Sequence, residues 1–480
     1  MTVLVIDVGT SGVRAAVVRP DASVAADRYE RVLPSSPFPG LVEFDPVVLA
    51  DTAVRLANDV LAAAGPVSSV GVATQRASAV VWDRATGEPV GSGIGWQDLR
   101  TVGDCLTLQG QGLRLAPNQT ATKVAHLLDQ VDPERTRDLC VGTVDSWLVW
   151  RLTAGERHVT DLTNAAVTGL LVPDASGWDD HVLEVLRIPR AALPDLVDSA
   201  GFVGHAQVLA GIPPITGLVG DQQASLVGQA GVRPGRAKVT FGTGAMLDVW
   251  VGPDRPAFPS RGPAGTFPIV TARIGGQLTW GVEAIMLSAG SNVEWLCDDL
   301  GLIGSAAESH DVAAACADTG GVVFVPALLG LGTPHWDYGA RGTLLGATRG
   351  TGRAELVRAV LEGVAQRGAD LVEAAESDAA VAIEVLRVDG GMSANPTFVQ
   401  ALADAAQRPV ELSPVLEATT LGAAFLAGIG TGAIDGLDAL DELWSPRAVV
   451  EPAGPTDRDR WREAVERARG WHGDLSALDF

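Results

Sequence analysis

Ile215-Thr216-Gly217-Leu218-Val219-Gly220-Asp221-Gln222-Gln223 is followed, after a short interval, by Lys238-Val239-Thr240-Phe241-Gly242-Thr243-Gly244-Ala245-Met246. The apolar run that ends at Gly220 predicts a strand, and Asp221 stands where a helix would begin. The second segment predicts another strand, which breaks on the Gly-Thr-Gly turn. The acidic side chain and a turn of a size that suits a phosphate group are therefore expected to lie close together.

Such a pairing suits phosphoryl transfer. The reaction needs a group that accepts the proton of an incoming hydroxyl, and closely spaced backbone N–H groups that hold the phosphates. Each motif also has a purely structural interpretation. An aspartate before a helix is commonly an N-cap, and a Gly-Thr-Gly between strands is commonly only a turn. The rest of the chain decides between the two interpretations.

Length and charge restrict the class of protein. A chain of 480 residues predicts roughly two to four domains. Its formal net charge of -23 argues against a surface for nucleic acid or anionic membrane, because those partners need a Lys/Arg face. Its only lysines, Lys123 and Lys238, do not follow a glycine, so the Gly-Lys-Ser/Thr phosphate loop is absent. A nucleotide would be held by backbone amides and a divalent cation instead.

The cysteines and the N-terminal segment indicate a reducing compartment. Four cysteines lie far apart and form no Cys-x-x-Cys pair: Cys105, Cys140, Cys297 and Cys316. The apolar run Val3–Ile6 meets Asp7 without a basic leader, so it predicts a strand and not a signal peptide. No apolar run is long enough to span a membrane. We therefore expect a cytoplasmic protein with reduced thiols.

A glycine-containing loop opens the chain. Val3–Ile6 and Arg14–Val18 are predicted strands, and the loop between them reads Asp7-Val8-Gly9-Thr10-Ser11-Gly12-Val13. Its glycines let the backbone approach a ligand, and its two hydroxyl side chains are donors for an anion. A plain hairpin with a polar tip is the structural alternative. The loop resembles the first phosphate loop of the actin, hexokinase and Hsp70 superfamily, which reads Asp-x-Gly-Thr followed by Arg or Lys.

The Gly242-Thr243-Gly244 hairpin is similar to a second copy of this loop, about half a chain later. Two such hairpins indicate two domains built on one plan that clamp a nucleotide between them. The break at Val232-Arg233-Pro234-Gly235 places the boundary. We predict an N-terminal domain over residues 1–233 and a C-terminal domain over residues 234–480.

Several further elements follow from hydrophobic spacing. Helices are predicted over 51–63, 123–131, 143–152, 355–373 and 419–427, and another from Pro396. Strands are predicted over 70–73, 79–82 and 386–389, and a loop over 253–268. The pair Gly390-Gly391, between a strand and a helix N-terminus, makes a corner that suits a nucleotide. Trp147 and Trp150 are expected in the core.

With these residues in place, the chain is identified as a member of the FGGY carbohydrate kinases, and within them it most resembles the glycerol kinases. The resemblance covers nearly the whole chain. The matching segments, in order, are Thr74-Gln75-Arg76, Trp82-Asp83, Trp96-Gln97, Arg100-Thr101, His158-Val159-Thr160-Asp161, Thr163-Asn164-Ala165, Gly220-Asp221-Gln222-Gln223, Gly242-Thr243-Gly244, Pro326-Ala327, Gly330-Leu331-Gly332, Ala340-Arg341-Gly342, Asp389-Gly390-Gly391, Asn395 and Thr419-Thr420-Leu421-Gly422-Ala423-Ala424.

The resemblance implies an α/β fold of two actin/hexokinase-like (ribonuclease H-like) domains with a nucleotide and substrate cleft between them. It also implies ATP and Mg²⁺ as cofactors. Asp221 would be the catalytic base, and Asp7 would hold Mg²⁺ largely through water. The resemblance further implies phosphate contacts at Gly9, Thr10, Ser11, Arg14, Thr243, Gly244 and Gly290, adenosine contacts at Gly390, Gly391 and Asn395, and an acceptor site lined by Arg76, Trp96 and Gln222.

The acceptor site is where the chain departs from the glycerol kinase pattern. Those enzymes typically carry a glutamate, a tyrosine and a phenylalanine at the positions of Ala77, Asn118 and Met246. His126 stands where the family segment often has tryptophan. Without this carboxylate and these two aromatic walls, a bound triol loses hydrogen bonds that can each be worth about 1 kcal/mol or more. We therefore hypothesise an acceptor larger than glycerol, such as a tetritol, a pentitol or a ketose.

The implied function is ATP-dependent phosphorylation of a small-molecule polyol or sugar, without nucleic-acid or membrane partners. Family members often form dimers or tetramers. The alternative is an ATP-driven binding or assembly protein like the chaperones and filament proteins of the same superfamily, and a catalytically inactive relative is a third interpretation. A dehydrogenase is disfavoured, because no Gly-x-Gly-x-x-Gly follows a strand.

Overall fold

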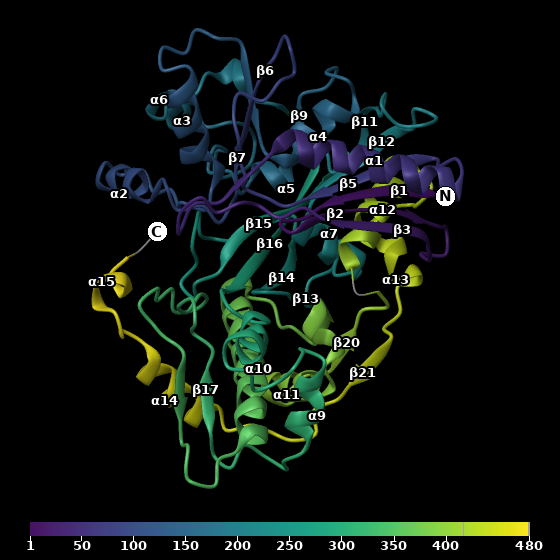
Figure 1. Cartoon of the computed structure of the whole chain (residues 1–480). Coiled ribbons are helices and arrows are strands. Elements are labelled where there is room, and N and C mark those ends of the chain that lie inside the picture. Colours follow the sequence, from purple (N-terminus) through teal and green to yellow (C-terminus); the bar gives the residue numbers. More distant parts are fainter. Residues whose placement is uncertain (416, 479–480) are drawn as a thin grey trace.

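The computed structural model describes residues 1–415 and 417–478, and a long mixed sheet runs through the molecule (Figure 1). Thirteen strands of the described chain form this sheet. From one edge to the other they are β21 (Ala448–Val450), β20 (Val410–Leu412), β19 (Val385–Asp389), β13 (Arg236–Phe241), β14 (Ala245–Gly252), β16 (Gln277–Met286), β15 (Phe267–Ile274), β11 (Ala200–His205), β12 (Pro214–Gly220), β5 (Ser69–Thr74), β1 (Val3–Val8), β2 (Gly12–Val18) and β3 (Val24–Arg31).

The sheet contains the same strand pattern twice. In the first half, β1, β2 and β3 form an antiparallel meander, while β5 and β12 add in parallel on the other side of β1. In the second half, β13, β14 and β16 form the meander, and β19 and β20 add in parallel beside β13. This repetition confirms the expectation of two halves built on one plan. The boundary near residue 233 stays a prediction.

Helices cover the two halves separately. In the first half α1 (Pro46–Ala64) and α4 (Val144–Leu152) enclose a core with β1, β2 and β5, and Trp147 and Trp150 are buried there as expected. In the second half α10 (Arg353–Ala379) and α11 (Pro396–Ala406) pack on β13, β14 and β19. Figure 1 shows the N-terminal half in purple and blue and the C-terminal half mostly in green.

Two helices lie where the halves meet. These are α7 (Asp221–Gly228), which follows β12, and α12 (Ala418–Gly430), which comes from late in the chain yet packs on β1, β5 and β12. A Cβ on Gly422 would lie 1.7 Å from the carbonyl oxygen of Ala224, and one on Gly228 would lie 2.0 Å from that of Ala418. The small residues predicted for this helix therefore allow contact at backbone distance.

The remaining elements are short. The other helices are α2 (Val102–Gly110), α3 (Thr120–Val131), α5 (Leu162–Ala165), α6 (Asp180–Val185), α8 (Ser291–Glu294), α9 (Glu308–Ala314), α13 (Leu440–Leu443), α14 (Arg458–Ala468) and α15 (Gly473–Ser476). Four strand pairs stand outside the main sheet: β4 (Glu43–Phe44) with β7 (Gly93–Ile94), β6 (Val80–Asp83) with β8 (Leu139–Gly142), β9 (Val159–Asp161) with β10 (Asp195–Val197), and β17 (Val323–Val325) with β18 (Thr343–Leu345).

Most predicted elements are present, with boundaries that differ by a few residues. The first helix begins at Pro46 rather than at 51, because the Asp45 carboxylate caps it by accepting from the N–H groups of Val47 and Val48. All four cysteines are free thiols. Over the described ranges, none of the helices combines the length and the apolar character needed to cross a membrane.

Candidate active site

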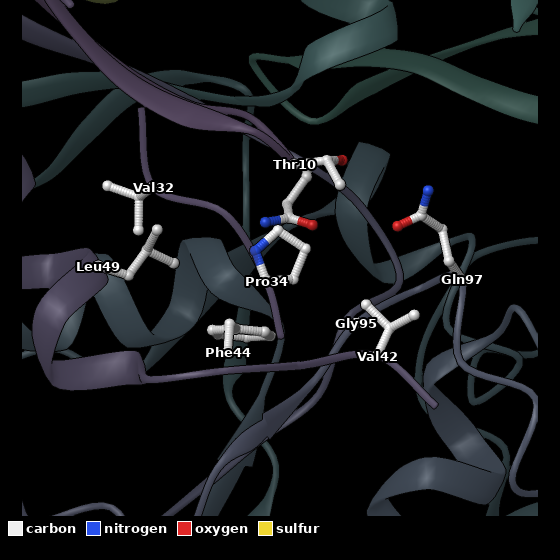
Figure 2. Close-up of a pocket in the computed structure, with 9 residues that line it drawn as sticks. Thr10, Val32, Pro34, Val42, Phe44, Leu49, Gly95 and Gln97 are labelled. Atoms are coloured by element: carbon white, nitrogen blue, oxygen red, sulfur yellow. The ribbon is translucent and has the colours of Figure 1, made fainter. Parts of the chain in front are cut away.

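The first glycine loop joins β1 to β2 as a tight turn, in which the Gly9 N–H donates to the Gly12 carbonyl at 3.0 Å. Two side chains from other loops hold it. Nε2 of Gln75 donates to the Gly9 carbonyl at 3.3 Å, and Nε1 of Trp96 donates to Oγ1 of Thr10 at 3.0 Å. Figure 2 shows the pocket that Thr10 lines. Gln75 and Gln97 also line it, and its other lining residues are Val32, Pro34, Val42, Phe44, Leu49 and Gly95.

Two charged residues flank this loop. Asp7, at the end of β1, has its pKa raised to about 7, first by burial and then by the nearby charges of Asp221 and Glu417. Arg14 lies opposite Asp7 in the β1–β2 register, and its guanidinium forms ion pairs with Asp27 at 2.5 Å and with Glu417 at 3.6 Å. Ser11 is exposed at the tip of the loop.

Asp221 is the first residue of α7, directly after the buried strand β12. Gly220, not Asp221, is the N-cap residue, so the carboxylate is not committed to capping the helix. Its Oδ1 accepts from the Gln222 N–H at 2.8 Å and lies 3.6 Å from Nε of Arg76. Burial raises the pKa of Asp221, and the charge of Arg76 opposes that rise.

A row of charged side chains crosses the second half of the sheet beside Asp221. The strand register places Lys238 on β13 opposite Asp248 on β14, and Asp248 opposite Glu283 on β16. Arg76, from the first half, extends the row, since its Nη2 donates to Oε2 of Glu283 at 2.5 Å. We call these four residues the charged row. All four side chains are buried or nearly so.

Sequence reasoning missed three members of this row: Lys238, Asp248 and Glu283. A signal was present, since each is a charged residue inside an otherwise apolar strand pattern, and such residues are seldom buried unless paired. The pattern could not show which partners they face, because the pairing of Lys238 with Asp248 depends on hairpin register, and Glu283 lies on a strand far from both in the sequence.

The other lysine organises the candidate acceptor wall. Lys123 on α3 is fully buried, and its Nζ donates to the carbonyl oxygens of Ala77 at 3.4 Å, Trp96 at 3.2 Å and Gln119 at 3.2 Å. Burial lowers its pKa to about 7. Ala77 is held there in the left-handed region, with φ of +61°. The ammonium therefore joins three chain segments that each carry, or directly adjoin, a predicted acceptor residue.

The remaining residues predicted to line the acceptor site occupy different environments. Met246 is half-buried on β14, two residues before Asp248, and so faces the same side of the strand as the charged row. Gln222 accepts at its Oε1 from Nζ of Lys238 at 2.6 Å. Asn118 is exposed, and within the described ranges its side chain makes no hydrogen bond to the other candidates; only its neighbour Gln119 is tied to the wall.

The second glycine loop joins β13 to β14 and is held against the start of α8. Carbonyl oxygens of Gly242 and Thr243 accept from the N–H groups of Gly290 and Ala289, at 2.9 and 2.8 Å. A Cβ on Gly290 would lie 2.6 Å from the Gly242 carbonyl, and one on Gly244 would lie 2.7 Å from that of Met286. The structure thus brings Gly290 against the loop that carries Thr243 and Gly244, from which it is far apart in the sequence.

The third predicted glycine site adjoins this loop. Gly390 follows β19 with φ of +84°, and a Cβ there would lie 2.5 Å from the carbonyl of Phe241, the residue before the loop. Gly391 begins a short 3-10 turn, and Asn395 caps α11 by accepting from the Phe398 N–H at 3.1 Å. Nδ2 of Asn395 also donates to Ser309 at 2.8 Å, so both ends of this amide are engaged.

Comparison with known proteins agrees with this geometry. Models of the FGGY family of carbohydrate kinases match residues 2–228 with the N-terminal domain and residues 237–431 with the C-terminal domain. A glycerol kinase of Trichlorobacter lovleyi is 41% identical over 98% of this chain and 99% of its own length. A crystal structure of Plasmodium falciparum glycerol kinase with ADP superposes with a TM-score of 0.88 at 27% identity, covering 100% of this chain and 99% of that one.

A xylulose kinase of Lactobacillus acidophilus shares the fold, with a TM-score of 0.85 at 19% identity over 99% of this chain and 98% of that one. Fold and site together define a two-domain kinase of the actin/hexokinase-like class. The chain belongs to the FGGY family of carbohydrate kinases. It is a glycerol-kinase-like phosphotransferase with an alcohol group as acceptor, and the family implies ATP as the donor. These relationships do not favour the alternative of an ATP-driven binding or assembly protein.

Proposed function

We propose that this kinase transfers the γ-phosphate of ATP to a primary hydroxyl of a small polyol or sugar, with Asp221 as the general base. The observation that carries the proposal is the environment of the Asp221 carboxylate. Burial raises its pKa, which makes it a stronger base, while Arg76 at 3.6 Å favours the ionised form that accepts a proton. Within the described chain no hydrogen bond reaches Oδ2, which leaves that oxygen available to the hydroxyl.

The phosphate chain would lie between the two glycine loops. Backbone N–H groups and hydroxyls of these loops suit oxyanions, and no large side chain need intervene. We assign Gly9, Thr10, Ser11 and Arg14 to one part of the phosphate chain, Thr243, Gly244 and Gly290 to another, and Gly390, Gly391 and Asn395 to the adenosine. Trp96 supports the assignment of Thr10, because the indole N–H donates to Oγ1 and fixes the orientation of that hydroxyl.

Asp7 would hold Mg²⁺, largely through water. The described chain offers no cluster of three His, Cys, Asp or Glu side chains for a metal, so protein atoms alone would not form a full coordination shell. The residues present fit an ion held mainly by water and phosphate, because Mg²⁺ prefers oxygen ligands and commonly keeps several waters. Burial, followed by the charges of Asp221 and Glu417, raises the pKa of Asp7 to about 7, and a cation bound there would offset this excess of negative charge. Such an ion supplies positive charge for the phosphate oxygens.

The acceptor is proposed to be larger than glycerol. Ala77 carries no group beyond its Cβ beside Arg76, and Met246 replaces a rigid wall with a flexible side chain. Arg76 also keeps one polar atom, Nη1, buried without a partner in the described chain. A four- or five-carbon polyol or a ketose would bring more hydroxyls to this space than a triol. Closure of the proposed domains, 1–233 and 234–480, would then exclude water from the reaction.

An ADP-release assay with Mg-ATP tests the proposal. The panel contains glycerol, tetritols, pentitols and ketoses, and a reaction without acceptor is the control. We expect a tetritol, pentitol or ketose to raise ADP release well above the control and to exceed glycerol in kcat/KM. Much faster turnover on glycerol than on any larger acceptor would defeat the size argument. If no acceptor in the panel raises ADP release above the reaction without acceptor, the kinase assignment for this class of substrate is wrong.

A further inference from the structure

Lys238 is buried between β13 and the start of α7, with its side chain fully excluded from solvent. Its Nζ donates to Oε1 of Gln222 at 2.6 Å and to Oγ1 of Thr240 at 3.2 Å. It also lies 2.8 Å from Oδ2 of Asp248, as an ion pair without the alignment of a hydrogen bond. Three oxygen atoms from three elements therefore surround one ammonium group.

This contact decides which way the Gln222 amide points. An ammonium group donates hydrogen bonds and cannot accept one, so it must face the carbonyl oxygen of the amide and not its NH₂ group. The NH₂ group of Gln222 is therefore directed away from Lys238. Within the described residues it has no hydrogen-bond acceptor, and Gln222 is the residue next to Asp221. The side chain thus offers a donor beside the proposed base.

The charged row explains how a lysine is retained at this depth. Two carboxylates, Asp248 and Glu283, lie opposite each other on neighbouring strands, an arrangement that is destabilising by itself. Lys238 balances Asp248 at one end, and Arg76 balances Glu283 at the other. The two carboxylates thus lie between two positive charges, and the ammonium stays where it meets Gln222.

We infer that Lys238 is a positioning residue for the acceptor, which holds Gln222 so that its NH₂ group donates to a hydroxyl or carbonyl oxygen of the bound polyol or sugar. The inference rests on the proposed function, because it takes the surroundings of Asp221 as the acceptor site. Asp248 acts through Lys238 by holding the ammonium group in place beside Gln222. Neither residue is required to touch the acceptor.

A thermodynamic cycle on the full-length protein tests this role. Removing Lys238 alone would leave Asp248 buried without a counter-charge, so the variant Lys238→Met/Asp248→Asn removes both charges together. It is compared with Gln222→Ala and with the triple variant, using the best acceptor from a panel of glycerol, erythritol, ribitol and xylulose. Acceptor KM, ATP KM and the acceptor-induced shift of the melting temperature are measured for each protein.

We call the variant Lys238→Met/Asp248→Asn the neutralised row. We expect it to raise the acceptor KM about fivefold, which is the effect of losing one oriented hydrogen bond, and to keep the ATP KM within about twofold of the wild type. In the Gln222→Ala background the same neutralisation should change the acceptor KM by less than about twofold, because the group it orients is gone. Lys238→Gln/Asp248→Asn, which restores a neutral donor, should recover most of the loss. A structural role alone predicts equal effects with and without Gln222.

The outcomes separate the inference from the function on which it rests. A wild-type enzyme whose ADP release ignores every acceptor overturns both. Acceptor-dependent turnover, with equal effects of the neutralised row in the two backgrounds, overturns the positioning role alone. If the neutralised row does not fold, the comparison passes to Lys238→Gln/Asp248→Asn and to Gln222→Ala. Gln222→Ala with an unchanged acceptor KM and an unchanged acceptor-induced melting shift then overturns the inference.

Discussion

Nη2 of Arg76 and Oε2 of Glu283 lie 2.5 Å apart, although Arg76 follows a strand of the first half and Glu283 sits on a strand of the second. Both side chains are almost completely buried. The same guanidinium approaches Asp221 through its Nε. One side chain thus links the proposed base to the sheet of the opposite half, and a change at Glu283 should affect both stability and the position of the base.

Glu283→Gln should destabilise the fold by about 3 kcal/mol, because it removes the carboxylate that pairs with the buried Arg76 guanidinium at 2.5 Å and leaves only Asp221, at 3.6 Å, as a counter-charge. Chemical denaturation monitored by tryptophan fluorescence measures the change. The matched control is Glu30→Gln, since Glu30 pairs with Arg55 on the surface, where both side chains are about half exposed. That loss should stay within about 1 kcal/mol. Equal losses at the two positions would contradict the special role of the buried pair.

Asp221→Asn should lower kcat for phosphoryl transfer by about 100-fold or more, because an amide cannot accept the proton of the attacking hydroxyl. The side chain keeps its size, so ATP binding should remain nearly unchanged, which titration with a fluorescent ATP analogue measures. Turnover at the wild-type rate would exclude Asp221 as the base. A large loss of ATP affinity would show that the carboxylate mainly organises the nucleotide site.

Lys123→Met should raise the acceptor KM and lower stability by about 2 kcal/mol or more, because buried carbonyls of Ala77, Trp96 and Gln119 lose their shared donor. The ATP KM is the internal control, since Lys123 makes no hydrogen bond to the glycine loops within the described chain. An unchanged acceptor KM in a folded variant would show that this wall is not part of the acceptor site.

Gly422→Ala should strongly impair folding, since its new methyl group would lie 1.7 Å from the backbone oxygen of Ala224 and would force α7 and α12 apart. Gly103→Ala is the control, because Gly103 lies in α2 with nothing within 4 Å of the added Cβ. That change should stabilise the protein by up to about 1 kcal/mol, as expected for an exposed helix. Thermal melts and soluble yield report both effects. A stable Gly422→Ala protein would contradict the close approach.

His158→Gln should reduce the loss of stability on acidification. His158 is packed between Trp82 and Trp150, and burial lowers its pKa from about 6.5 to about 4. The unfolded chain therefore takes up a proton below pH 6.5 that the folded chain takes up only near pH 4. The stabilising contribution is complete above pH 6.5 and declines by about 3 kcal/mol as pH falls to 4.

The difference in unfolding free energy between wild type and His158→Gln, measured at several pH values, isolates this group. The buried carboxyls Asp7 and Asp145, whose pKa values are raised to about 7, act in the opposite direction in both proteins and cancel in the difference. A difference that does not vary between pH 7 and pH 4 would show that His158 titrates normally.

Local patterns were sufficient to predict the elements that carry the glycine loops. Gly9 and Gly12, Gly242 and Gly244, and the pair after Asp389 each interrupt an apolar strand pattern, so the sequence itself marks where the chain turns. The repetition of the first loop in the second half also predicted two halves built on one plan, and the structure shows the repeated strand pattern. These signals depend only on residues adjacent in the chain.

Contacts across the sheet could not be predicted in the same way. Opposition of Lys238, Asp248 and Glu283 depends on strand register, and a shift of one residue would turn each side chain to the other face. The approach of Arg76 depends on how the two halves sit together. Alignment with a family motif placed Asn118 in the acceptor wall; the structure exposes its side chain, and its role in the acceptor site stays a prediction.

The burial of Lys123 and Lys238 has a practical consequence for chemical labelling. The sequence contains no other lysine, so the folded protein has no accessible side-chain amine. Amine-directed crosslinkers, dyes and immobilisation chemistry should modify only the N-terminus of the native protein. Mass spectrometry after acetylation would then count unfolded molecules directly, since each lysine reacts only when the acceptor wall or the charged row opens.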